Sequence, residues 1–164
     1  MIISISGQDT YRSRQYLKQT IEQFKKTRDQ QGYNVVVLDG KNEELGKIIG
    51  EIRATPFLSP RRMIVINNVL SNSDKSLLAE LIVGVKENKI PESNVVVFWQ
   101  GETISKVKES KELEALLKKQ KYAQEFELLK GVKLNGWIKA EVEKQSGKIS
   151  ASALSYLAVN AGYD

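Results

Sequence analysis

The sequence contains no cysteine and no histidine among its 164 residues. Without cysteine, these residues can form no disulfide, thiolate nucleophile, iron–sulfur cluster or cysteine zinc site. Without histidine, they can form no Ser-His-Asp triad, and no imidazole is present to act as a general base or a metal ligand. The remaining options are carboxylates, lysine, tyrosine, hydroxyl groups, or phosphate chemistry with Mg²⁺. This scarcity of catalytic side chains is the first indication of function.

Long apolar runs are also missing. No stretch approaches the roughly 18 apolar residues that a transmembrane helix needs, and residues 1–7 lack the basic segment and cleavage site of a signal peptide. We therefore expect a cytoplasmic protein with no membrane partner. The net charge of +5 is mild, and it permits contact with nucleic acid without requiring it. A hydrophobic content of 41% and a charged content of 27% are ordinary for a globular protein.

Short apolar runs alternate along the chain with longer segments of helical periodicity. The runs predict strands over residues 2–5, 35–38, 63–66, 95–99 and 122–126. Helices are predicted over residues 10–31, 45–52, 74–86, 109–119, 134–142 and 150–157, and three of them are expected to have the N-caps Asp9, Asn42 and Ser150. The second to fourth runs are continuous rather than alternating, which indicates burial on both faces of a parallel sheet. The sequence therefore predicts an α/β fold with a five-stranded, doubly wound parallel sheet flanked by helices.

The loop after the first predicted strand is where such a fold would bind a phosphate group. A P-loop needs a second glycine, a lysine and a serine or threonine, but counted from Gly7 these positions hold Arg12, Ser13 and Arg14. The third strand ends in Asn67 rather than in an acidic residue for Mg²⁺. Gly7 also lacks the companion glycines of a dinucleotide-binding turn. The sequence therefore predicts no ATP hydrolysis, no catalytic residue, no cofactor and no metal.

The charged residues allow a second interpretation. Acidic residues near strand ends most often cap helices, and no spacing singles out a catalytic pair among Asp9, Asp39 and Glu44. Residues 1–28 hold six basic and two acidic side chains. Five of the basic residues could face phosphates or could form a solvated helix face: Arg12, Arg14, Lys18, Lys25 and Lys26. A basic α/β module that binds nucleic acid is therefore an alternative function.

The segment 54–62 is unusual because it places Phe57 and Leu58 between two prolines, Pro56 and Pro60, outside any predicted helix or strand. Proline stiffens a loop, and stiffness lowers the entropic cost of binding. An aromatic and an aliphatic residue on a stiff loop beside basic residues are typical of a protein-binding hot spot. The residues alone leave open the alternative that Phe57 and Leu58 fold back onto the core.

Five short segments carry a resemblance to a known family: Gly7-Gln8-Asp9-Thr10-Tyr11, Val37-Leu38-Asp39-Gly40, Thr55-Pro56-Phe57-Leu58-Ser59, Asn94 to Phe98, and Leu134-Asn135-Gly136-Trp137-Ile138. In this order and spacing they resemble the N-terminal part of the delta subunit of bacterial DNA polymerase III, a component of the sliding-clamp loader. The resemblance implies an AAA+-like (P-loop NTPase-like) α/β domain without an ATP site over 1–132. It also implies the beginning of a helical lid domain over 133–164, with the rest of the lid and a C-terminal collar domain lying outside the chain.

The resemblance implies a binding function rather than catalysis by this chain itself. In this family the N-terminal domain binds the ring-shaped beta sliding clamp and helps to open it for loading onto DNA during replication, and two hydrophobic residues enter a pocket on the clamp. The matching positions are Phe57 and Leu58, which would be framed by Thr55, Pro56, Ser59 and Arg61. Other clamp-loader subunits are expected partners through the missing domains, and the resemblance allows weak contact with DNA.

Three features depart from the family pattern. The family often has leucine before phenylalanine, whereas this chain has Phe57 before Leu58. Pro60 replaces a commoner polar or acidic residue, and Gln8 replaces the usual glutamate. Both orders of the hydrophobic pair are large and apolar, so we expect the plug chemistry to survive.

Overall fold

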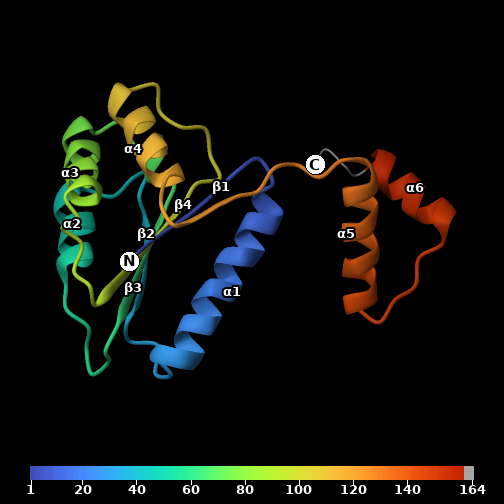
Figure 1. The fold of residues 1–164 in the computed structure, drawn as a ribbon, viewed down its shortest axis with the longest axis horizontal. Helices are drawn as coiled ribbons and strands as arrows, with labels where there is room; N and C mark the ends of the chain where they lie inside the picture. Colours follow the sequence, from blue (N-terminus) through green and yellow to red (C-terminus); the bar gives the residue numbers. More distant parts are fainter. Residues whose placement is uncertain (161–164) are drawn as a thin grey trace. The chain divides into compact units, whose positions relative to one another are not determined.

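The computed structural model describes residues 1–160, which Figure 1 shows as a ribbon. The strands are β1 (Ile2–Ser6), β2 (Val35–Asp39), β3 (Arg62–Asn67), β4 (Asn94–Trp99) and β5 (Tyr122–Glu125). The helices are α1 (Thr10–Arg28), α2 (Leu45–Arg53), α3 (Lys75–Lys86), α4 (Lys108–Lys118), α5 (Gly131–Lys144) and α6 (Ala151–Asn160), with a short 3-10 turn η1 (Val69–Ser71) after β3. Every predicted strand is present, and its bounds differ from the prediction by at most one residue.

The strands form one sheet in the order β2-β3-β4-β1-β5, and every neighbouring pair is parallel. β4 lies in the middle, and each of its residues is buried. This position explains why its sequence is continuously apolar, since neither face of the strand meets water. The expected five-stranded parallel α/β sheet is confirmed.

Helices cover both faces of the sheet, so the sheet separates two apolar clusters. Because successive side chains of a strand point to opposite faces, β3 contributes to both. Its Ile64 and Ile66 pack with apolar residues of α2, α3 and α4. Its Met63 and Val65 pack with Phe24 of α1. Figure 1 shows α1 on one side of the strands and α2, α3 and α4 on the other.

Two of the three expected N-caps are confirmed. The Asp9 carboxylate accepts a hydrogen bond from the Arg12 backbone N–H at 2.9 Å, and the Ser150 hydroxyl accepts one from the Ala153 N–H at 3.2 Å. The expectation for Asn42 is wrong, because α2 begins only at Leu45 and its N-cap makes no side-chain hydrogen bond. The Asn42 amide instead donates to the Asp39 carboxylate at 2.7 Å, which holds it in the turn after β2.

The chain divides into two compact units, residues 1–126 and residues 127–164. The first contains the whole sheet with α1 to α4, and the second contains the helices α5 and α6. No residue of α5 or α6 is buried. The boundary expected after residue 132 falls inside α5, and the assignment of the second unit to a lid domain stays a prediction. Within the described residues, no helix is long and apolar enough to cross a membrane.

Candidate functional site

The loop of residues 54–61 connects α2 to β3, so it lies at the edge of the sheet where the parallel strands begin. Ligands of open α/β sheets normally bind at the opposite edge, where the strands end. A site on this loop is therefore separate from the place where a nucleotide would bind in this type of fold.

Phe57 and Leu58 project from this loop into solvent, with exposed fractions of 60% and 90%. The alternative in which both side chains fold back onto the core is therefore not observed. Leu58 has a backbone φ of 48°, in the left-handed region that residues other than glycine rarely adopt. Tyr33, which is 65% exposed, lies edge-on to Phe57 with 6.4 Å between the ring centroids. Three large apolar side chains therefore share one exposed surface, an arrangement typical of binding sites.

A buried asparagine holds the loop at Phe57. The Asn34 side chain donates from Nδ2 to the Phe57 carbonyl at 2.8 Å and accepts from the Phe57 N–H at Oδ1 at 2.6 Å. Asn34 is 1% exposed and stands immediately before β2. Because one amide satisfies both backbone groups of Phe57, the peptide is fixed in the same way as by a neighbouring strand.

A second buried asparagine holds the beginning of the loop. Asn94, the first residue of β4, donates from Nδ2 to the carbonyls of Ile52 and Ala54, each at 2.8 Å. Asn94 is fully buried. Of the two residues that follow Ala54, Thr55 is exposed and Pro56 is half-buried. The loop is therefore anchored at its start and at Phe57, and the hydrophobic side chain of Phe57 is left outside.

Ser59 and Arg61 fasten the far side of the loop. The Ser59 hydroxyl donates to the carbonyl of Arg28, the last residue of α1, at 2.8 Å. The Arg61 guanidinium donates from Nη1 to the Glu92 backbone carbonyl. Both side chains therefore hold the loop against neighbouring backbone segments and stabilise its conformation.

Two arginines lie at the loop that carries the exposed apolar residues, and the acidic Glu92 lies beside one of them, Arg61. Arg28 and Arg61 are exposed, and neither forms an ion pair within residues 1–160, whereas Arg53 is paired with Glu80. The Met1 ammonium group donates to the Asn94 carbonyl at 2.8 Å. Burial lowers the pKa of this ammonium group below its usual value, and the positive charge of Arg61 lowers it further. The surface therefore suits a partner whose apolar pocket has an acidic rim.

The opposite edge of the sheet offers little to a nucleotide. At the start of α1, where a phosphate would accept N–H groups, the Asp9 carboxylate already accepts the Arg12 N–H. Gly7 packs so tightly that an added Cβ would lie 2.2 Å from the Phe126 carbonyl oxygen. Within residues 1–160, no group of three carboxylates is placed to hold a metal ion. This geometry agrees with the missing P-loop residues.

The basic residues of α1 are partly occupied. Arg12 forms an ion pair with Asp9 at 3.2 Å, and the Arg14 guanidinium lies 4.2 Å from the centroid of the Trp99 ring. Lys18 lies 3.9 Å from Glu22, and Lys25 and Lys26 are exposed near the end of the helix. Nothing in these contacts tests binding of nucleic acid, so the nucleic-acid interpretation remains a prediction.

Sequence reasoning missed three residues of the loop's surroundings: Tyr33, Asn34 and Asn94. Both asparagines stand directly before or at the start of an apolar strand. A polar amide in that position is a weak signal for a residue that anchors an adjacent loop. Tyr33 carried no signal in the sequence, because its contact with Phe57 is made across 24 positions of the chain.

The comparisons agree with this architecture. The family model described as "DNA polymerase III, delta subunit" matches residues 4–127. Among solved structures, the Bacillus subtilis DNA clamp loader delta protein (YqeN) is similar with a TM-score of 0.64 and 20% identity, over 99% of this chain and 49% of that chain. A gamma subunit-related protein of DNA polymerase III from Thermotoga maritima is similar with a TM-score of 0.53 and 15% identity, over 88% of this chain and 47% of that chain. No curated protein gives a significant match.

These structural similarities show the fold, and the chain spans about half the length of the two structures. The family match covers most of the chain, including both anchoring asparagines and the exposed loop between them. The chain therefore belongs to the DNA polymerase III delta subunit family.

Proposed function

We propose that this chain is the clamp-binding part of a clamp-loader delta subunit, acting in the bacterial cytoplasm. It binds the ring-shaped beta clamp through Phe57 and Leu58, with Thr55, Pro56, Ser59 and Arg61 framing the contact. The observation that carries this proposal is the exposure of the two apolar side chains on an anchored loop, at 60% and 90%. Single exposed apolar residues are common on protein surfaces, but adjacent ones that form a contiguous patch are typical of a site that binds another protein.

The binding energy comes mainly from apolar burial. Complete burial of a large apolar side chain contributes about 1.5–3 kcal/mol. Loss of both Phe57 and Leu58 should therefore weaken binding by about two to four orders of magnitude, at about 1.4 kcal/mol per tenfold. Because the loop is already fixed by Asn34 and Asn94, little energy is spent in ordering it.

Opening of the ring follows from a difference in affinity. A bound protein shifts the equilibrium between a closed and an open ring only by the difference between its affinities for the two states. In this proposal the loop and the adjacent α2 fit the open ring better than the closed ring. Association with the other loader subunits is part of the proposed role of the longer protein. ATP binding is not part of the role proposed for this chain, because the Asp9 carboxylate already accepts a backbone N–H at the start of α1.

The test is binding to the beta clamp of the same organism, measured by surface plasmon resonance. The wild type is compared with Phe57→Ala/Leu58→Ala and with the control Val37→Ala/Tyr122→Ala, which removes two other exposed side chains from β2 and β5. Circular dichroism checks that all three are folded. Selective loss of binding in the loop variant supports the proposal. Absence of wild-type binding, or equal binding by the loop variant, overturns it.

The alternative function is binding of nucleic acid by the basic residues of α1. It predicts affinity for DNA without any clamp, and a steep decrease of that affinity with salt. The same instrument measures this with immobilised duplex DNA at low and high salt. Tight binding that is lost in Lys18→Gln/Lys25→Gln would favour the alternative over the clamp proposal.

A further inference from the structure

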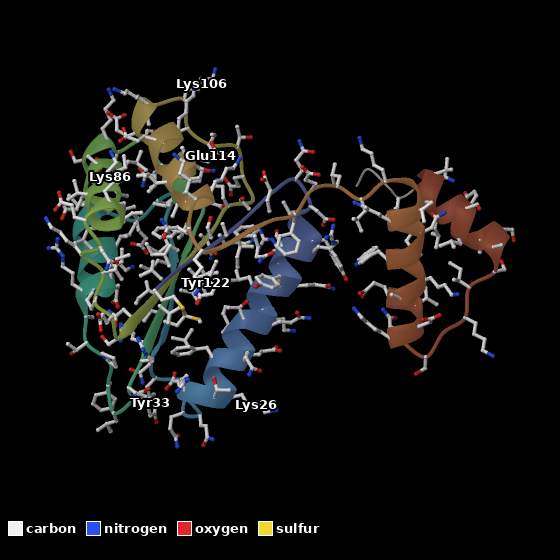
Figure 2. The ribbon with its side chains drawn as sticks, in the orientation of Figure 1. Lys26, Tyr33, Lys86, Lys106, Glu114 and Tyr122 are labelled. Carbon is white, nitrogen blue, oxygen red and sulfur yellow. The ribbon has the colours of Figure 1, made fainter. Side chains whose placement is uncertain are left out.

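The turn between α1 and β2, residues 29–34, is joined to the exposed loop at three points. The Asn34 amide pairs with the Phe57 backbone, and the Ser59 hydroxyl reaches the carbonyl at the end of α1. The Tyr33 ring meets the Phe57 ring edge-on, with an angle of 72° between the planes. In Figure 2, Tyr33 and Lys26 lie toward the same end of the first unit, and Lys106 and Glu114 lie toward the other end.

We propose that this turn is the second half of the clamp-docking surface, in which Tyr33 contacts the clamp beside Phe57 and Asn34 is a positioning residue for Phe57. The inference rests on the proposed clamp binding and extends it to residues outside the loop. The partner's face then carries a pocket for Phe57 and Leu58 and a shallower apolar area beside it for the tyrosine ring.

Exposure and chemistry assign Tyr33 to this surface. Its side chain is 65% exposed, and the ring lies against that of Phe57 rather than against the core. A partner that covers the Phe57 ring must come close to the Tyr33 ring, whose centroid is only 6.4 Å away. Tyrosine is enriched in binding hot spots because it brings a large rigid area with few rotatable bonds.

Hydrogen bonding assigns the positioning role to Asn34. Its amide has one orientation that satisfies every neighbour: Nδ2 donates to Phe57 and to the Asp29 carboxylate at 3.1 Å, and Oδ1 accepts from Phe57. The Asn34 carbonyl also accepts the Met63 N–H at 2.7 Å, so its backbone is tied to β3. Phe57 is therefore held by a group that is itself immobile, which lowers the entropic cost of binding.

A matched control exists at the other edge of the sheet. Asn72 is also buried, donates from its amide to the Gly40 carbonyl at 2.9 Å, and accepts from the Asp74 N–H at 2.8 Å. Each of these two amides therefore joins its own segment to a distant one, which for Asn72 is the turn at Gly40. Of these two asparagines, only Asn34 contacts the exposed loop. A loss of clamp binding in Asn34→Ala that is absent in Asn72→Ala therefore reports the position of Phe57 rather than the general stability of the fold.

The experiment measures clamp binding by the full chain with the variants Tyr33→Ala, Tyr33→Phe, Asn34→Ala and Asn72→Ala. We expect Tyr33→Ala to weaken binding about tenfold, and Tyr33→Phe to bind within about threefold of the wild type, because the ring makes the contact. We expect Asn34→Ala to weaken binding about tenfold, mainly through slower association, and Asn72→Ala to bind like the wild type.

A local readout separates positioning from structure. In Asn34→Ala, the Phe57 amide should exchange its hydrogen at least about tenfold faster, while amides of β3 remain protected. If Asn34→Ala does not fold, the clamp affinity of Tyr33→Ala still tests the inference, because the Tyr33 side chain is on the surface and its removal should leave the fold intact. Wild-type affinity in Tyr33→Ala and in a folded Asn34→Ala, with binding still lost in Phe57→Ala/Leu58→Ala, overturns this inference and leaves the proposed function standing. No binding by the wild type overturns the proposed function itself.

Discussion

The Asp29 carboxylate accepts two hydrogen bonds from Asn34, one from its backbone N–H at 2.8 Å and one from its side-chain amide at 3.1 Å. Asp29 is 5% exposed and directly follows α1. This pairing turns the Asn34 amide so that its oxygen faces the Phe57 N–H. The end of α1, the start of β2 and the exposed loop are therefore coupled through one polar network.

Removal of the carboxylate should weaken both the fold and the loop. In Asp29→Ala the Asn34 backbone N–H loses its partner, and the Asn34 side-chain amide keeps only its hydrogen bond to the Phe57 carbonyl. An unsatisfied buried donor costs about 1–3 kcal/mol. We expect a lower urea midpoint and faster hydrogen exchange at the Phe57 amide. The control is Asp74→Ala, which removes the N-cap of α3 and costs about 1 kcal/mol without touching the loop. Equal exchange rates at Phe57 in both variants would contradict the coupling.

Leu58 is expected to strengthen clamp binding while lowering the stability of the fold. Its φ of 48° is strained for leucine, and its side chain is 90% exposed, so it contributes almost nothing to the core. Asparagine tolerates this conformation. We expect Leu58→Asn to keep or raise the free energy of unfolding, by up to about 1 kcal/mol, and to bind the clamp at least about tenfold more weakly.

The control for this prediction keeps the apolar character and increases the strain. In Leu58→Ile the branched Cβ is disfavoured in the left-handed region, so the free energy of unfolding should fall. Urea denaturation and clamp binding are measured on both variants. A clear loss of stability in Leu58→Asn would show that the exposed leucine supports the fold after all.

The sheet is predictable from the sequence because its signals are local. β3 and β4 are continuous apolar runs, and the burial of both their faces follows from that pattern alone. The start of α2 is less predictable, because Asn42 has the right residue type for a cap but is captured by Asp39 in a turn. The residue type shows that Asn42 is able to cap a helix, but the neighbouring turn determines that its side chain bonds to Asp39 instead.

The candidate site is predictable only in part. The prolines and apolar residues of the loop mark it in the sequence, but residue type alone favours burial of Phe57 and Leu58. Their exposure depends on anchors far away in the chain: Asn34 is 23 positions from Phe57, and Asn94 is 40 positions from Ala54. These contacts between distant residues form only once the strands have paired in the sheet, so the sequence pattern does not indicate them.

Arg28 should steer association with an acidic partner. It is exposed beside the loop and forms no ion pair within the described part of the chain, and only its backbone carbonyl is used by Ser59. We expect Arg28→Gln to slow association with the clamp about two- to fivefold at low salt. The difference should vanish near 1 M salt, where the screening length is about 3 Å. The control Lys106→Gln changes a lysine toward the other end of the first unit (Figure 2) and should leave the association rate unchanged.

Two glycine substitutions should have opposite effects on stability. Gly7 has a φ of 120°, and an added Cβ would lie 2.2 Å from the Phe126 carbonyl oxygen, so Gly7→Ala should lower the free energy of unfolding by at least about 2 kcal/mol. Gly50 lies within α2, and an added Cβ would meet nothing within 4 Å. Gly50→Ala should therefore raise that free energy by about 0.5–1 kcal/mol. Urea denaturation measures both changes. The turn after β1 is packed against the backbone of Phe126, so a tolerated Gly7→Ala would mean that this turn has room to move, and the geometric argument against a phosphate site there would fall.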